Sequence, residues 1–282
     1  KIGFRDLVDG NGRELTLAQL RARGAGAATK PAITPAVMTF RTVSPPKGRV
    51  AANEMMVANR IAKRSDIKGE AQAIKMVPMA ALEMTERFGI PEVDFAGHVN
   101  KVIKGVRLPP GLGGAIITAT RKDGSKFDVL HLPNDFGKKS EALFELAKNT
   151  NAKHIARRKF EIDALAEIDP ELKSRIIKLP NSKYNHSISV GFDGVDQSRA
   201  VIVHEYGHLF HDHVAKKQID NFLDEVKPTK TGWGHLVSSY ASTLPIEYVA
   251  ESFTVFNMLP VSEHFRIHPK LLAIFKKADR SQ

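Results

Sequence analysis

The hydrophobic pattern of the chain changes near residue 50. Between Asn53 and Phe88 apolar residues recur at helical spacing, with interruptions near Lys68-Gly69 and before Pro78. The pattern predicts helices over this range, broken at those two places. In residues 1–50, glycines and prolines interrupt every apolar run. We therefore expect a flexible N-terminal arm or linker there.

Alternating apolar residues predict a small β-sheet in the middle of the chain. Two β-rich runs, 115–120 and 127–132, flank a polar turn that contains Asp123-Gly124, which is typical of a hairpin. A third alternating run, 185–190, predicts a half-buried strand. Helical spacing predicts further helices at 140–149, within 153–168, and at about 199–217. Strands and helices distributed in this way indicate an α+β fold.

Composition and charge narrow the class of protein. The 282 residues include no cysteine, which excludes disulfides and cysteine-based zinc sites. The formal charge is +11, and most of it lies in residues 1–150, with 24 Lys and Arg against 15 Asp and Glu. Such a basic region can bind nucleic acid or another anionic surface. The alternative is that the charge only keeps the protein soluble. The chain shows no signal-peptide pattern and no apolar run of about 18 residues, so we expect no membrane span.

The strongest chemical signal is an H-E-x-x-H sequence at residues 204–208. On an α-helix His204 and His208 lie one turn apart on the same face, where two imidazoles can bind one Zn²⁺. Glu205 lies beside the first histidine and is placed to take a proton from a water molecule. The alternative is a surface helix with incidental histidines, but the apolar residues of this segment predict a buried side.

A catalytic zinc site with two histidines needs a third protein ligand. The metzincin spacing is excluded, because that pattern requires a histidine at position 214 and the chain has Val214. Glu225 lies at a plausible distance along the chain, but Pro228 places it near a helix end. Glu247 is the better candidate, because Pro245 just before it marks the first turn of a helix.

The predicted helix after Pro245 carries two acids on one face. Ser242 or Thr243 can cap this helix, and Glu247 and Glu251 are then one turn apart. Such a like-charge pair destabilises an isolated helix by a few tenths of a kcal/mol. A cation bound against that face turns this unfavourable interaction into a favourable one. We therefore assign Glu247 as the third metal ligand. Glu251 is expected to accept a hydrogen bond from a ligand histidine.

The predicted strand at 185–190 precedes the H-E-x-x-H segment. An edge strand beside a peptidase cleft can hold an extended substrate through backbone pairing. An ordinary strand of the sheet is the alternative interpretation. The candidate substrate-binding residues in this strand are His186, Ser187, Ile188, Ser189 and Val190.

Three motifs together carry a family resemblance. Residues 204–208 read H-E-Y-G-H, residues 247–253 read E-Y-V-A-E-S-F, and Tyr240 stands seven residues before Glu247. This combination resembles the catalytic domain of the anthrax lethal factor-like zinc metalloproteases, which have H-E-x-G-H and a tyrosine seven residues before an E-[FY]-x-A-E-x-F helix. The segment 269–275 is similar to the last helix of that family. The resemblance covers roughly residues 185–280.

The resemblance implies a zincin-like domain with one Zn²⁺ per chain. In it His204, His208 and Glu247 bind zinc, Glu205 is the general base, and Tyr240 steadies the oxyanion. The expected fold is a small twisted sheet packed on helices, with the H-E-x-x-H helix beneath a cleft. We predict a flexible arm at 1–50, a helical basic region at 51–110 and the zincin-like catalytic domain at 111–282.

The predicted function is zinc-dependent hydrolysis of peptide bonds in a peptide or protein substrate. The resemblance also points to related domains in phage head-associated proteins and bacterial toxins, so the alternative is a virion-associated or other assembly protein. Its zincin site would be vestigial or structural, and it would act through the basic N-terminal half on nucleic acid or a virion partner.

Overall fold

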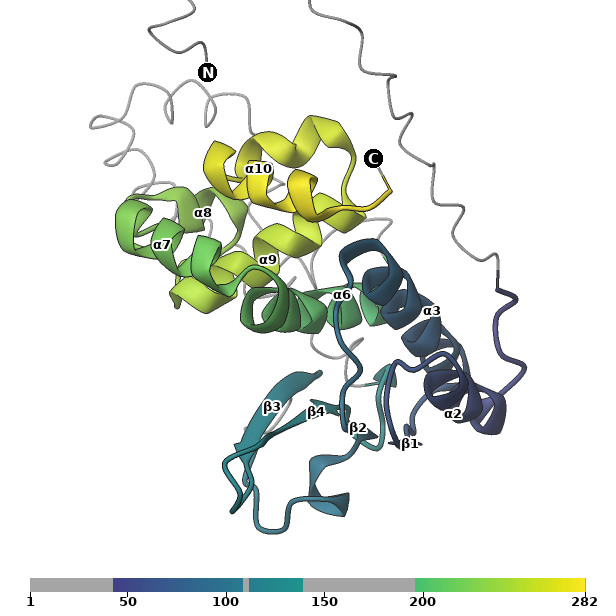
Figure 1. The fold of residues 1–282 in the computed structure, drawn as a ribbon. Coiled ribbons are helices and arrows are strands. Elements are labelled where there is room, and N and C mark those ends of the chain that lie inside the picture. The colour runs from purple at the N-terminus through teal and green to yellow at the C-terminus, as the bar shows by residue number, and fades with distance from the viewer. Residues whose placement is uncertain (1–42, 109–111, 139–195, 282) are drawn as a thin grey trace, which may run out of the picture. The chain divides into compact units, whose positions relative to one another are not determined.

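The computed structural model describes residues 43–108, 112–138 and 196–281 (Figure 1). Several predicted elements lie outside these residues. They are most of the arm at 1–50, the helices at 140–149 and 153–168, and the candidate substrate strand at 185–190.

Four short strands form one mixed sheet within the described residues. They are β1 (Ser65–Asp66), β2 (Phe95–Gly97), β3 (Ala115–Thr120) and β4 (Lys126–His131), in the order β1-β2-β4-β3. β1, β2 and β4 run parallel, and β3 runs antiparallel to β4. In the turn, Gly124 takes a φ of 81° and the Ser125 N–H donates to the Asp123 carboxylate at 2.9 Å. The predicted hairpin is therefore confirmed.

Two helices confirm most of the helical pattern before residue 90. They are α2 (Arg49–Ala58) and α3 (Ala71–Phe88), and the predicted break near Lys68-Gly69 lies between them. The predicted break at Pro78 is wrong, because α3 continues through it. An interior proline costs about 3 kcal/mol. The buried face of α3, which includes Val77, Ala81 and Met84, offsets this cost.

The two parts of the chain on either side of residue 110 share one sheet. β2 pairs with β4, so the strand order crosses the boundary predicted at 110–111. Helix α3 also packs against α6 (Gln197–Leu209), and the described residues belong to one compact unit. The region 51–110 thus contains the strands β1 and β2 as well as helices and a short 3₁₀ turn at Val99–Lys101.

The C-terminal part is helical. The helices are α6, α7 (Lys216–Val226), α8 (Trp233–Val237), α9 (Pro245–Met258) and α10 (Pro269–Ala278), with a 3₁₀ segment at Val261–Arg266. The helix predicted at 199–217 is not continuous, because a π-helical turn at Phe210–Val214 separates α6 from α7. Side-chain pairs to other elements hold this wide turn: His211 Nε2 lies 2.8 Å from Asp220 Oδ1, and His213 Nε2 lies 2.9 Å from Asp128 Oδ2.

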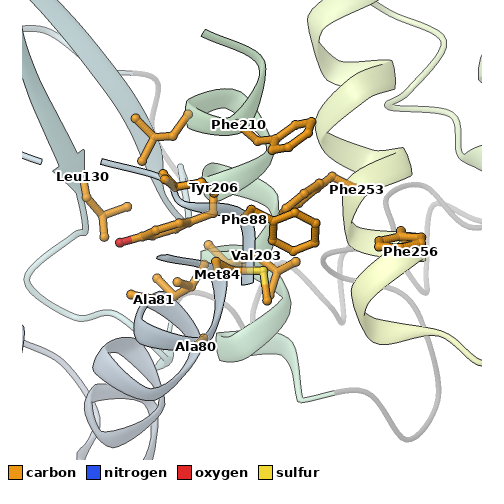
Figure 2. Packing of buried hydrophobic residues seen from close by; sticks show 14 of the residues in the cluster. Ala80, Ala81, Met84, Phe88, Leu130, Val203, Tyr206, Phe210, Phe253 and Phe256 are labelled. Carbon is orange, nitrogen blue, oxygen red and sulfur yellow. The ribbon is translucent and has the colours of Figure 1, made fainter. Parts of the chain in front are cut away.

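Helix α6 lies at the centre of the packing. It contacts α9, α3 and β3 (Figure 1). Figure 2 shows Phe88 of α3 gathered with Phe210 and Phe253. The centroids of these three rings are 4.8–5.6 Å apart, within the range of favourable aromatic pairs. This core fixes α6 between the sheet and α9.

The architecture is α+β, with a small mixed sheet and helices, as the pattern of the sequence predicts. Among the helices that the structure describes, none has the length and the apolar character that crossing a bilayer requires.

Candidate metal centre

Helix α6 presents the two histidines of the H-E-x-x-H segment. Asp196 caps its start by accepting a hydrogen bond from the Arg199 N–H at 3.0 Å, and almost every residue from Ala200 to Leu209 is buried. His204 and His208 lie one turn apart, with ring centroids separated by 5.1 Å. The buried helix therefore holds both rings on one face.

Helix α9 supplies the acid, and Pro245 lies in its first turn as expected. The residue that caps the helix is Leu244, whose side chain makes no capping hydrogen bond, so the predicted cap by Ser242 or Thr243 is wrong. The Thr243 hydroxyl instead donates to the Tyr240 carbonyl at 2.7 Å. It therefore stabilises the preceding turn, and Pro245 with its fixed φ starts the helix.

The two helices approach closely at Gly207 and Ala250. A Cβ atom on Gly207 would lie 2.8 Å from the Ala250 Cα and 3.2 Å from the Phe253 Cβ. Real Cβ atoms essentially never make a 2.8 Å contact. Position 207 has no side chain and position 250 has a small one. The two helices therefore lie close enough for the acids of α9 to reach the histidines of α6.

Three ligand atoms converge at this contact. Oε2 of Glu247 lies 3.2 Å from Nε2 of His204 and 3.5 Å from Nε2 of His208. One ligand atom from each of the three residues lies within 4.8 Å of the other two. The predicted convergence of residues some forty positions apart is confirmed, and the group could hold a metal ion.

The donor set fits zinc. Two ligands at about 2.0–2.1 Å from a tetrahedral Zn²⁺ are about 3.3 Å apart, and the two distances from Glu247 fall on either side of that value. Two imidazoles and a carboxylate are the ligands of one class of catalytic zinc site, which leaves a fourth position for water or substrate. The two distances from Glu247 are therefore compatible with tetrahedral coordination.

Glu251 lies on the side of the His204 ring that faces away from Glu247. Its Oε1 is 2.9 Å from Nδ1 of His204, and its Oε2 accepts a hydrogen bond from the Ser238 hydroxyl at 2.7 Å. Because Nδ1 faces Glu251, Nε2 is the ring nitrogen directed towards Glu247 and His208. A carboxylate in this position fixes the tautomer and the orientation of a ligand histidine.

The electrostatics of the group favour positive charge. Burial disfavours the protonated His204 ring, but hydrogen bonds with Glu247 and Glu251 and the negative charges of Glu251 and Glu205 outweigh burial and raise its pKa well above the ordinary value. Burial likewise disfavours ionised Glu247, yet hydrogen bonds from His204 and His208 lower its pKa. An anionic pocket of this kind attracts a cation.

The carboxylate of Glu205 is held by the sheet. Its Oε2 accepts a hydrogen bond from the Ile116 N–H of β3 at 2.8 Å, and β3 is the last strand in the order of the described sheet. Burial raises the pKa of Glu205, although the neighbouring histidines oppose the shift. The sequence predicted the hairpin but not its contact with Glu205, because pairing periodicity says nothing about which helix a strand faces.

Tyr240 lies beside the same group. Its ring centroid is 5.9 Å from that of His204, and its side chain hydrogen-bonds to Glu247. Burial raises its pKa, and the negative charges of Glu247, Glu205 and Glu251 add to the effect. The phenol is therefore protonated near pH 7 and acts as a hydrogen-bond donor.

Some residues considered from the sequence do not join the site. Glu225 is exposed and pairs with Lys270 of α10, so it is not the third ligand. Residues 186–190 lie outside the described residues. Ser238 was missed by the sequence reasoning, since a buried serine just before the tyrosine turn carries no motif of its own.

Comparisons with known proteins found no relative of this chain. The chain matches no family model, no curated protein and no solved structure. None of these comparisons bears on the resemblance of the motif residues to the lethal factor-like proteases.

Proposed function

We propose that this chain is a zinc-dependent endopeptidase. The observation that carries the proposal is the convergence of His204, His208 and Glu247, with the separate carboxylate of Glu205 one residue from the first ligand. A purely structural zinc site is normally closed by four protein ligands. Within the described residues this group offers three, which suits catalysis.

In the proposed reaction a bound Zn²⁺ supplies Lewis acidity, which polarises the peptide carbonyl and lowers the pKa of a water molecule towards about 7. Glu205 accepts the proton of the attacking water and later delivers it to the leaving amine. Its hydrogen bond from Ile116 holds one carboxylate oxygen, and the other stays available for the proton. The raised pKa of Glu205 suits a group that must take up and release a proton.

Tyr240 donates a hydrogen bond to the oxyanion as the carbonyl becomes tetrahedral. Its half-buried phenol beside His204 and Glu247 supports this role, and one such donor is typically worth about 3 kcal/mol of transition-state stabilisation. Glu251 keeps His204 in the tautomer that directs Nε2 at the metal position.

The substrate class follows from the position of Glu205. An extended peptide beside β3 would meet Glu205 near the start of that strand, at Ile116, and pairing through the backbone tolerates varied side chains. The strand predicted at 185–190 remains a second candidate for this role. The basic N-terminal half is a proposed contact for an anionic partner.

The test is metal analysis combined with cleavage of a mixed peptide library. We expect one Zn²⁺ per chain, cuts that a chelator abolishes, and recovery of cleavage when zinc is restored. Glu205→Gln should retain the metal and lose turnover. Stoichiometric zinc with no cleavage of any peptide would instead favour the assembly protein with a structural or vestigial site.

A further inference from the structure

Ser238 occupies a buried position between α8 and α9. It is the residue that follows α8, and its side chain is fully inaccessible to solvent. Its hydroxyl makes two hydrogen bonds at once. It donates to Oε2 of Glu251 at 2.7 Å and accepts from the Ala241 N–H at 2.9 Å.

The first of these bonds leads to the metal ligands. Oε1 of Glu251, the oxygen that Ser238 does not contact, lies 2.9 Å from Nδ1 of His204. Nε2 of the same ring lies 3.2 Å from Oε2 of Glu247. Glu251 therefore contacts both Ser238 and the His204 ring, so the position of its carboxylate bears on the position of the imidazole.

The second bond leads to the turn that carries Tyr240. The Ala241 N–H belongs to the peptide directly after Tyr240, and the Thr243 N–H closes the same turn by donating to the Tyr240 carbonyl at 3.0 Å. The Ser238 hydroxyl thus contacts both the peptide beside Tyr240 and the carboxylate behind His204.

The framework around Ser238 is rigid. The Ser238 N–H donates to the Gly234 carbonyl at 3.0 Å. Buried Arg266 donates to the Leu236 carbonyl at 3.3 Å. A Cβ on Gly234 would lie 2.8 Å from the Ser242 Cα. Helix α8 is thereby fixed against the turn, so the hydroxyl has a defined position from which to act.

We infer that Ser238 is a positioning residue that couples the orientation of the ligand His204 to the position of Tyr240 through one hydroxyl group. The inference rests on the proposed function and adds to it a residue that touches neither the metal position nor the substrate. A hydroxyl both donates and accepts, so threonine can replace it and alanine cannot. Loss of such an outer contact at a metal site typically costs 10–100-fold in metal affinity or activity.

The experiment compares Ser238→Ala, Ser238→Thr and the matched control Ser239→Ala in the full chain. Ser239 is the adjacent serine, and within the described residues its buried hydroxyl has no hydrogen-bond partner. Zn²⁺ affinity is measured by competition with a chromogenic chelator, coordination by the absorption spectrum of the Co²⁺-substituted protein, and kcat by peptide cleavage at saturating zinc. Circular dichroism confirms that each variant is folded.

We expect Ser238→Ala to weaken Zn²⁺ binding by about 10–100-fold, to alter the Co²⁺ spectrum and to lower kcat. Ser238→Thr should restore all three values to within about threefold, and Ser239→Ala should match the wild type. In the background of Glu251→Gln, Ser238→Ala should cause little further loss of affinity, since its effect passes through Glu251.

Wild-type zinc affinity and spectrum in Ser238→Ala would overturn the inference, as would an equal loss in Ser239→Ala. If Ser238→Ala does not fold, Ser238→Thr decides: a folded threonine variant with tenfold weaker zinc binding contradicts the coupling. The metal measurements do not need turnover. Zinc binding without cleavage in the wild type therefore defeats the proposed function alone, while the response of zinc affinity to Ser238→Ala still tests the coupling.

Discussion

Gly207 on α6 lies directly against Ala250 on α9, and a Cβ atom on Gly207 would come within 2.8 Å of the Ala250 Cα. This contact sets the distance between the helix that carries two imidazoles and the helix that carries the acids. The site depends on it, because Glu247 and Glu251 both reach across the same interface.

Gly207→Ala tests this dependence. Alanine is favoured over glycine in a helix by about 1 kcal/mol, but overpacking a tight contact costs about 1–3 kcal/mol. We expect a net loss in the free energy of unfolding and zinc binding at least about tenfold weaker, the range seen when contacts around a metal site are lost. Urea unfolding and zinc competition measure the two effects. Gly48→Ala is the control, because beyond its chain neighbours no atom of the described residues lies within 4 Å of its Cβ position. Unchanged zinc affinity in Gly207→Ala would show that the separation is not critical.

Tyr240→Phe separates catalysis from metal binding. The phenol hydroxyl is the proposed oxyanion donor, and removing one such donor lowers kcat by about 100–1000-fold in other enzymes. The three ligands stay in place, so zinc content should remain one per chain. Steady-state kinetics and metal analysis on the same preparation provide the test. An unchanged kcat would reject the role assigned to Tyr240.

Removing the metal should lower the thermal stability. A ligand that binds only the folded state at a hundred times its Kd adds about 2.7 kcal/mol, which corresponds to a shift in Tm of roughly 5 °C for a chain of this size. Differential scanning calorimetry with zinc and with chelator measures the shift. In His208→Ala the two curves should nearly coincide, and a full shift in that variant would place the stabilising metal elsewhere.

The pairing of Arg87 with Asp279 predicts a dependence of stability on pH. Burial would raise the pKa of Asp279, but hydrogen bonds from Arg87 and Ser281 and the charge of Arg87 lower it below the ordinary value of 3.8. A lowered pKa in the folded state gives stability that is complete above the unfolded-state pKa and is lost as the pH falls through the folded one. We therefore expect Asp279→Asn to reduce the free energy of unfolding by about 1–3 kcal/mol at pH 7, and by progressively less below about pH 4.

The control for this pair is Glu225→Gln. Glu225 pairs with Lys270, and more than half of each side chain is exposed, so its loss should change the free energy of unfolding much less than the loss of Asp279 does. Urea unfolding at pH 7 and pH 3.5 compares the variants with the wild type. A difference for Asp279→Asn that is the same at both pH values would contradict the argument. Zinc content should be normal in Glu225→Gln.

Local periodicity was sufficient for several elements. The hairpin around Asp123-Gly124, the helix that carries His204 and His208, and the helix that begins at Pro245 follow from spacing and turn residues that lie within a few positions of each other. The choice of Glu247 also came from local chemistry, because a like-charge pair on one helix face needs a cation to be favourable.

The tertiary structure alone decided the remainder. Helix α3 passes through Pro78 because its buried face outweighs the lost hydrogen bond. The sheet crosses residue 110 because β2 pairs with β4. Glu205 accepts a hydrogen bond from the Ile116 N–H, 89 positions away in the sequence. Glu251 accepts one from the Ser238 hydroxyl, 13 positions away. Sequence spacing determines which side chains share a face, whereas contacts between faces depend on how the elements pack, and that depends on the whole core.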